Sequence, residues 1–280
     1  MAEFTFKGRR VARDGAMVMA IINRTPDSFY DAGQNFADDD AMRSVVRGVE
    51  EGADIIDIGG VKAGPGSDVD VAEELRRTVP FLRAVRARFP DVVISIDTWR
   101  ADVARVAIDE GADLINDTWS AADPGLIEVA AELGAGFVCS HTGGLTPRHR
   151  PMRVRFPDIV GSVLEEAVGR AERLVAAGVP REGILIDPTH DFGKNTWHGL
   201  ALLRHVDELV ATGWPVLMAL SNKDFVGETL GVPLPERVDG TLAATAIAAA
   251  AGSAVFRAHQ VGRTRKVLDT VRDLLAHQAR

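Results

Sequence analysis

The sequence has little cysteine and no long apolar run. Cys139 is the single cysteine among 280 residues, which excludes an internal disulfide and is consistent with a reducing cytoplasm. Residues 1–7 include Glu3 and lack the apolar core of a secretory signal. The least polar stretch, residues 243–256, is shorter than the about 20 residues of a membrane span. We therefore expect a cytoplasmic protein in which this stretch is a buried helix that runs into a strand.

Positive charge is also in the minority. The chain has 32 Lys and Arg against 40 Asp and Glu, a formal net charge of -8. This balance argues against nonspecific binding to nucleic acid or to an anionic membrane. A linker rich in Pro, Gly or Ser is missing as well, so we expect residues 1–280 to form one domain.

The chain repeats a pattern of helical segment, glycine and short apolar run. Residues 51–57 and 110–116 are near copies of this unit. Glycine accepts the left-handed conformation at a helix C-terminus, and short apolar runs that do not alternate are typical of strands buried on both faces. The runs are residues 16–23, 54–58, 92–97, 114–117, 136–141, 184–187, 215–221 and 254–259.

Amphipathic stretches between these runs indicate helices. Strands that alternate with helices form parallel βα units, and eight such units predict a (β/α)8 TIM barrel of the α/β class. An open doubly wound sheet is the rival, disfavoured because no G-x-G-x-x-G follows the first run. Residues 4–13 are a candidate hairpin at the barrel bottom. The expected helices are residues 40–52, 72–89, 101–111, 124–134, 157–178, 200–213 and 263–279.

Polar residues close the apolar runs. The carboxyl ends of barrel strands converge on one face, where TIM-barrel active sites lie, so these residues form a candidate site. Any one of them could instead cap the next helix, but that reading does not explain the whole set. They are Asn23, Asp57, Asp97, Asn116, His141, Asp187, Ser221 with Lys223, and Arg257 with His259.

Two groups differ in chemistry. A carboxylate such as Asp187 can accept two parallel N–H bonds from a 2-aminopyrimidinone edge. Asn23, Arg257 and His259 bring donors and positive charge from the first and last strands, and suit phosphate. A salt bridge from Arg257 or His259 to a core carboxylate is the alternative. The group suited to a flat heterocycle is Asp97, Asn116, Asp187 and Lys223.

Ordered motifs make the chain resemble the dihydropteroate synthases. Residues 23–31, Asn-Arg-Thr-Pro-Asp-Ser-Phe-Tyr-Asp, are similar to the family signature Asn-Val-Thr-Pro-Asp-Ser-Phe-Ser-Asp. The later motifs follow in order through nearly the whole barrel. They are Asp57-Ile-Gly-Gly60 with Pro65-Gly66, Ser95-Ile-Asp-Thr98, Asn116-Asp117, Asp187-Pro188 with Phe192-Gly-Lys194, Ser221-Asn-Lys223 and Arg257-Ala-His259.

The resemblance implies condensation of 6-hydroxymethyl-7,8-dihydropterin pyrophosphate with p-aminobenzoate in a homodimer. It implies that Asp97, Asn116, Asp187 and Lys223 hold the pterin. Asn23, Arg257 and His259 would hold the pyrophosphate, with Mg2+ near Asn23. Phe192 and Ser221 would lie beside the p-aminobenzoate pocket. The catalytic residues would be Asp97, Lys223 and Arg257, because fixed charges stabilise the cationic centre and the leaving pyrophosphate.

The lid and second-substrate side depart from the family. The second loop, Gly-Gly-Glu-Ser-Thr-Arg-Pro-Gly in the family, is Gly-Gly-Val-Lys-Ala-Gly-Pro-Gly at residues 59–66, and Lys62 is a poor substitute for the arginine fork. Asn222, Asp191 and Trp119 are changed too, whereas the pterin residues are not. The pattern predicts a divergent, actinobacterial-type paralogue with weak or altered synthase activity. The alternative is a catalytically inactive pterin-binding paralogue with a non-folate or regulatory role.

Other chemistries are disfavoured. A folate-type methyltransferase would not need the anion corner of Arg257 and His259. A Schiff-base lysine should be desolvated, and Lys223 has polar neighbours. A metal hydrolase using His141, His190 and Asp191 lacks metal-ligand spacing.

Overall fold

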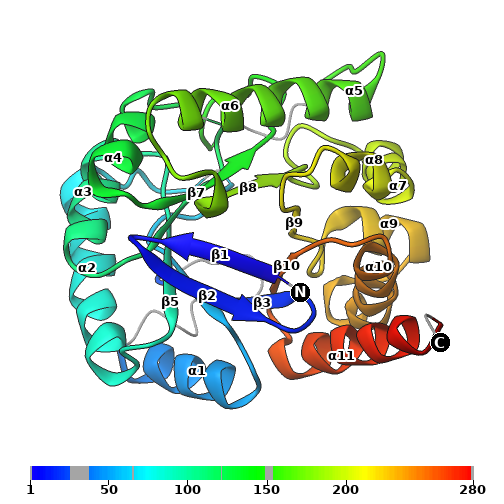
Figure 1. The fold of residues 1–280 in the computed structure, drawn as a ribbon, viewed down its shortest axis with the longest axis horizontal. Helices are drawn as coiled ribbons and strands as arrows, with labels where there is room; N and C mark the ends of the chain where they lie inside the picture. The colour runs from blue at the N-terminus through cyan, green and yellow to red at the C-terminus, as the bar shows by residue number, and fades with distance from the viewer. Residues whose placement is uncertain (1, 26–37, 65, 121, 149–153, 279–280) are drawn as a thin grey trace.

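The computed structural model describes residues 2–25, 38–64, 66–120, 122–148 and 154–278, which form an α/β barrel (Figure 1). Eight parallel strands pair in the order β8-β7-β6-β5-β4-β3-β10-β9. A parallel bridge from Ile186 to Val216 joins the two ends of this row, so the predicted TIM barrel is confirmed. The strands are β3 (Met17–Asn23), β4 (Ile55–Gly59), β5 (Val93–Asp97), β6 (Leu114–Asp117), β7 (Gly136–Ser140), β8 (Ile184–Asp187), β9 (Leu217–Met218) and β10 (Val255–Ala258).

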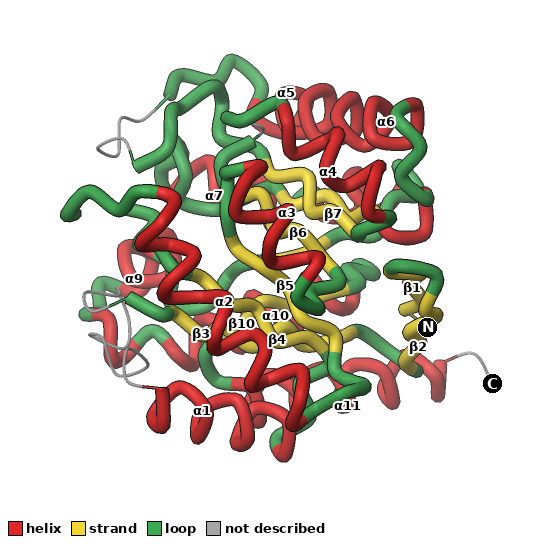
Figure 2. The backbone as a smooth tube through the Cα atoms, turned by 90° about the vertical axis from the view of Figure 1, so that its left-hand side faces the viewer, coloured by secondary structure: helices red, strands yellow, loops and turns green. Residues whose placement is uncertain are grey.

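Helices cover the outside of the strands (Figure 2). The principal ones are α1 (Asp38–Glu50), α2 (Val71–Arg88), α3 (Ala101–Asp109), α4 (Gly125–Leu133), α5 (Ile159–Val163), α6 (Gly169–Ala176), α7 (Thr196–Arg204), α8 (Val206–Ala211), α9 (Asp224–Leu230), α10 (Val238–Ala250) and α11 (Val261–Gln278). Short helical turns are η1 (Leu164–Val168), η2 (Arg181–Gly183) and η3 (Leu234–Glu236).

Two expected helices are interrupted. The π-helical turn η1 separates α5 from α6 within residues 157–178. The segment predicted at 200–213 is two helices, α7 and α8, which meet at His205. α7 also begins earlier than predicted, because the Asn195 side chain caps it by accepting the backbone N–H of His198.

The N-terminal hairpin closes one end of the barrel. β1 (Ala2–Phe6) and β2 (Arg9–Arg13) pair antiparallel, as predicted, and lie across the barrel in Figure 1. Phe4 and Phe6 join the apolar side chains of the strand starts in one cluster. A Cβ at Gly136 would lie 2.3 Å from the Phe6 ring, so this contact requires glycine at the start of β7. The opposite end, seen in Figure 2, carries the loops that follow the strands.

The Ala-rich stretch runs from helix to strand as predicted, since α10 ends at Ala250 and β10 begins at Val255, but α10 buries only one face and Ile247 on it is exposed. Within the described residues, every helix is too short or too polar to cross a membrane. β9 is shorter than the predicted strand 215–221. The chain turns after it, with the Lys223 N–H donating to the Leu220 carbonyl and Asn222 at a φ of 56°. This turn carries Ser221 and Lys223 to the barrel mouth.

Candidate active site

The carboxyl ends of the strands surround a cavity of about 260 Å³, here called the barrel-mouth cavity. Most of the predicted site residues line it, together with the second-loop residues Val61, Lys62, Ala63 and Gly64. The predicted residues in its wall are Asn23, Asp97, Phe192, Ser221, Lys223, Arg257 and His259. Asn116 and Asp187 are buried at the ends of the neighbouring strands β6 and β8. The structure therefore brings the predicted set to one end of the barrel.

Arg257 joins two carboxylates at this mouth. Its Nε donates to Asp57 Oδ2 at 2.7 Å, and its Nη2 donates to Asp97 Oδ2 at 2.8 Å. Thr118 donates to the other oxygen of Asp97 at 2.8 Å. The salt bridge considered for Arg257 from the sequence is thus present, and a phosphate ligand would compete with these carboxylates for the guanidinium.

Asp57, which the sequence placed among the strand-end residues without a specific role, is the hub of the site. It is fully buried on β4 and accepts the Ser95 hydroxyl at 2.6 Å and the Asn116 amide N–H at 3.1 Å, besides Arg257. A buried charge needs such partners. In the sequence, Asp57 is a carboxylate inside an apolar run. This position indicated a strand end, but it did not indicate that Ser95, Asn116 and Arg257 would bind the carboxylate.

Burial shifts the acid–base behaviour of the site carboxylates. Burial raises the pKa of Asp97, and the Arg257 guanidinium opposes this shift. Burial also raises the pKa of Asp187 to about 6, opposed by the Thr189 backbone N–H, which donates to it at 2.7 Å. Burial lowers the pKa of Lys223. The two carboxyls, Asp97 and Asp187, therefore change protonation at a pH close to neutral.

The anion corner has less positive charge than its residue types suggest. β3 and β10 pair in parallel, which places Asn23 and Arg257 on neighbouring strands as predicted. Burial, with the nearby Arg257 and Lys223, lowers the pKa of His259 to about 3, so its ring is neutral at pH 7. His259 Nδ1 lies 2.9 Å from the Ser221 hydroxyl. His259 therefore offers a neutral ring to this corner, and of the three residues Asn23, Arg257 and His259 it is Arg257 that brings positive charge.

An aromatic wall borders the other side of the cavity. The Lys223 ammonium lies 4.8 Å from the centre of the Phe192 ring. Trp119 packs edge-on against Phe192, with ring centres 5.0 Å apart. Lys194, another residue absent from the predicted set, donates to the backbone carbonyls of His141, Thr189 and Phe192 at 2.7–3.1 Å. It holds the Phe192 loop in place, and its position in the Phe192-Gly-Lys194 motif was the available signal.

The residues considered for a metal hydrolase do not converge. His141 Nε2 lies 3.0 Å from the Ser162 hydroxyl, whereas the His190 ring packs near Phe225. Among the residues with described positions, no three His, Cys, Asp or Glu side chains are grouped to hold a metal. In the first motif, residues 26–31 lie outside the described residues, and so does Pro65 of the second.

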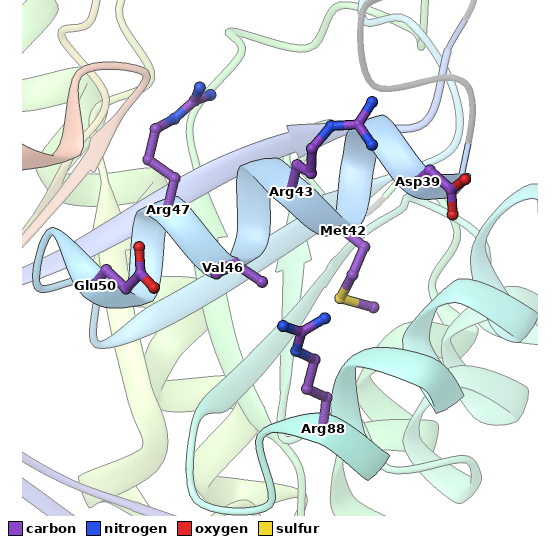
Figure 3. A pocket seen from close by; sticks show the side chains of 7 residues that line it. All are labelled: Asp39, Met42, Arg43, Val46, Arg47, Glu50 and Arg88. Carbon is purple, nitrogen blue, oxygen red and sulfur yellow. The ribbon is translucent and has the colours of Figure 1, made fainter.

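Two other cavities lie away from the strand ends. Figure 3 shows a groove of about 430 Å³ between α1 and α2, in which Arg43 and Arg47 point away from Arg88. These guanidinium groups do not converge on one ligand. A second groove, of about 520 Å³, is lined by loop residues such as Asp68 and Arg148. The barrel-mouth cavity is thus the one of these three that gathers the strand-end residues.

Comparisons with known proteins identify the family of the chain. Residues 19–259 match the pterin binding enzyme family. The chain is 63% identical over 268 residues to "Inactive dihydropteroate synthase 2" of Mycobacterium leprae, covering 94% of this chain and 92% of the relative. A solved Mycobacterium tuberculosis structure has 51% identity and a TM-score of 0.76 over 97% of both chains. A Yersinia pestis dihydropteroate synthase solved with a sulfonamide drug has 36% identity and a TM-score of 0.92, covering 98% of this chain and 99% of that one. The chain therefore belongs to the pterin-binding enzymes, as a divergent member of the dihydropteroate synthase family.

Proposed function

We propose that this chain binds a pterin pyrophosphate in the barrel-mouth cavity and catalyses dihydropteroate synthesis weakly or with an altered second substrate. The observation that carries the proposal is the convergence of Asp97, Asn116, Asp187 and Lys223 from four separate strand ends. Their mixture of buried acceptors and one cation suits a flat heterocycle with an amide-like edge.

The buried network orients the pterin residues. Asn116 donates its amide N–H to Asp57, which fixes the direction of its carbonyl oxygen. Asp187 would accept the 2-amino and ring N–H groups of the pterin, because a carboxylate can receive two parallel donors. Asp97 would lie near the methylene carbon and stabilise positive charge as the pyrophosphate leaves. The neutral His259 ring and Arg257 would donate to that leaving group.

The donor set at Asn23 fits a magnesium ion. Asn23 lines the cavity and offers one hard amide oxygen. Mg2+ keeps several waters and takes phosphate oxygens, so it needs few protein ligands. The ion would neutralise charge on the pyrophosphate. The proposal thus includes Mg2+ as the cofactor and a cytoplasmic location.

We also propose a homodimer. Ile247 on α10 and Leu274 on α11 are exposed and offer apolar surface for a second copy.

Reduced turnover follows from the second loop. Its residues line the cavity, but Lys62 supplies a point charge in place of a planar arginine fork. Losing one preorganised contact to a transition state lowers the rate by a factor of about 10² to 10³. The inactive, pterin-binding alternative is favoured by the word "Inactive" in the name of the relative with 63% identity.

Pterin binding and product formation should be measured on the same sample. We expect calorimetry to detect binding of the pterin pyrophosphate with magnesium. A steady-state assay with p-aminobenzoate should show turnover about 10²-fold or more below that of a conventional synthase. Binding without product would select the inactive alternative, and an absence of pterin binding would overturn the proposal.

A further inference from the structure

Two carboxylates stand on the Phe192 side of the barrel-mouth cavity. Asp191 and Asp224 both line it, next to Phe192 and Lys223. Asp191 has a φ of 72°, a conformation that favours glycine. Asp224 is the first residue of α9. Negative charge therefore lies on the wall beside which the second substrate is proposed to bind.

Asp191 also occupies the backbone donors of this wall. Its Oδ2 accepts the Asp224 N–H at 2.5 Å, and its Oδ1 accepts the Phe225 N–H at 3.4 Å. Unpaired N–H groups at the start of a helix attract anions. Here the Asp191 carboxylate already accepts the first two N–H groups of α9. A ligand carboxylate at this wall would meet occupied donors and like charge.

The cations that face these carboxylates have partners of their own. Arg237 Nη1 binds Asp224 Oδ1 at 2.8 Å and the Asn222 carbonyl at 3.0 Å. Lys223 lies over the Phe192 ring and interacts with Asp191, Asp187 and Asp224. Lys194 also interacts with Asp191, and Lys62 adds one positive charge from the second loop. Asp224 is exposed and paired with Arg237, whereas Asp191 is partly buried, so we expect Asp191 to contribute more of the repulsion toward a ligand carboxylate.

We propose that this wall selects an aromatic amine without a carboxylate as the second ligand. The ring would pack against Phe192, which Trp119 holds from its edge, and a neutral or cationic substituent would face Asp191 and Asp224. This proposal rests on the proposed function, because it assumes that an amine binds beside the pterin site. It concerns binding, so it can be tested on a protein with little or no turnover.

The test compares two ligands that differ in charge. 4-Aminobenzoate and 4-aminobenzamide are titrated into the full chain by calorimetry, with and without 6-hydroxymethylpterin and magnesium pyrophosphate. We expect wild-type protein to bind the amide about tenfold more tightly than the acid, because like charges a few ångströms apart repel strongly in a partly buried site. Asp191→Asn keeps an acceptor and tolerates positive φ. It should tighten 4-aminobenzoate binding about tenfold and leave the amide unchanged.

Asp158→Asn is the matched control. Asp158 caps α5 by accepting the Gly161 N–H at 3.0 Å and does not line the cavity, so its replacement should leave the acid-to-amide ratio unchanged. The proposal is overturned by equal or tighter binding of the acid to wild-type protein, or by an unchanged ratio in Asp191→Asn. Failure of both amines to bind any variant overturns it as well. Titration of the pterin alone decides the proposed function separately.

Discussion

At the scale of single residues, Asp187 couples the site to pH. Burial raises its pKa to about 6, so a modest fall below neutral pH protonates it. A protonated carboxyl keeps fewer acceptor positions for N–H donors. The ionised form is the one that matches a pyrimidinone edge.

Asp187→Ala should therefore abolish pterin binding, because the heterocycle loses its paired acceptor. In wild-type protein, pterin affinity should fall as the pH is lowered from 7.5 through 6 to 5, while the ionised fraction of Asp187 decreases. Calorimetry at these pH values checks both expectations. Asp158→Asn, at an exposed cap that does not line the cavity, serves as a control. Unchanged binding by Asp187→Ala would refute the pocket assignment.

The candidate site could be predicted residue by residue only in part. Strand-end position was enough to gather Asp97, Asn116 and Lys223, since parallel strands bring their carboxyl ends together. Partners were not predictable in this way. The bonds from Asp57 to Arg257 and from Asp191 to the start of α9 join residues far apart in the chain. Their geometry depends on how the barrel closes.

At the scale of elements, the second loop is the segment that would best account for the low turnover that we propose. Replacing residues 62–64, Lys-Ala-Gly, by Ser-Thr-Arg should raise synthase turnover about 10²-fold if one missing contact is the defect. Steady-state kinetics with p-aminobenzoate measures this, and pterin affinity on the same sample should not change. No gain in turnover would show that the second-substrate wall around Asn222 and Asp191 also limits the reaction.

The bottom hairpin is the element that should matter for stability alone. Phe6 is fully buried against Gly136, so Phe6→Ala removes a large ring from a closed cluster. We expect the free energy of unfolding to fall by about 3–5 kcal/mol in urea denaturation. Val11→Ala, which truncates a partly buried side chain of β2, should cost less. Pterin affinity should be unchanged, and an equally stable Phe6→Ala would contradict the role of the hairpin.

Element positions followed from the sequence better than element continuity. The glycine-run pattern located all eight barrel strands because it reflects a local requirement at helix ends. The π turn η1 was not predictable, since it places Glu166 next to His141, a contact that forms only in the folded barrel. The early start of α7 could have been predicted from Asn195, a residue type that often caps helices, but the prediction relied on the spacing of apolar residues alone.

At the scale of the whole molecule, buried histidines tie stability to pH. Burial lowers the pKa of His141, His190 and His259 to about 3, below the ordinary histidine value of about 6.5. As the pH falls below 6.5, these histidines therefore bind protons in the unfolded chain but not in the folded chain. This contribution to stability is complete above pH 6.5 and is lost as the pH falls toward 3. The raised pKa of Asp187 acts in the opposite direction, because the folded state holds that proton more tightly.

His190→Leu isolates one of these histidines. Its ring is fully buried near Phe225, and leucine fills a similar space without titrating. Between pH 7.5 and 5, wild-type protein should lose about 2 kcal/mol more stability than His190→Leu. Urea denaturation at the two pH values gives this difference. His205→Gln, at an exposed histidine paired with Glu208, should behave like wild-type protein. Parallel pH curves for wild-type protein and His190→Leu would rule out a contribution from this ring.

The N-terminal hairpin closes the barrel at the end opposite the barrel-mouth cavity. The residues that we expect to stabilise the fold and those that we expect to select the ligand therefore lie at opposite ends of the barrel. Substitutions around the barrel-mouth cavity can change or remove the reaction, while the hairpin at the other end continues to stabilise the barrel. In such a protein, substitutions that change ligand specificity need not destabilise the fold.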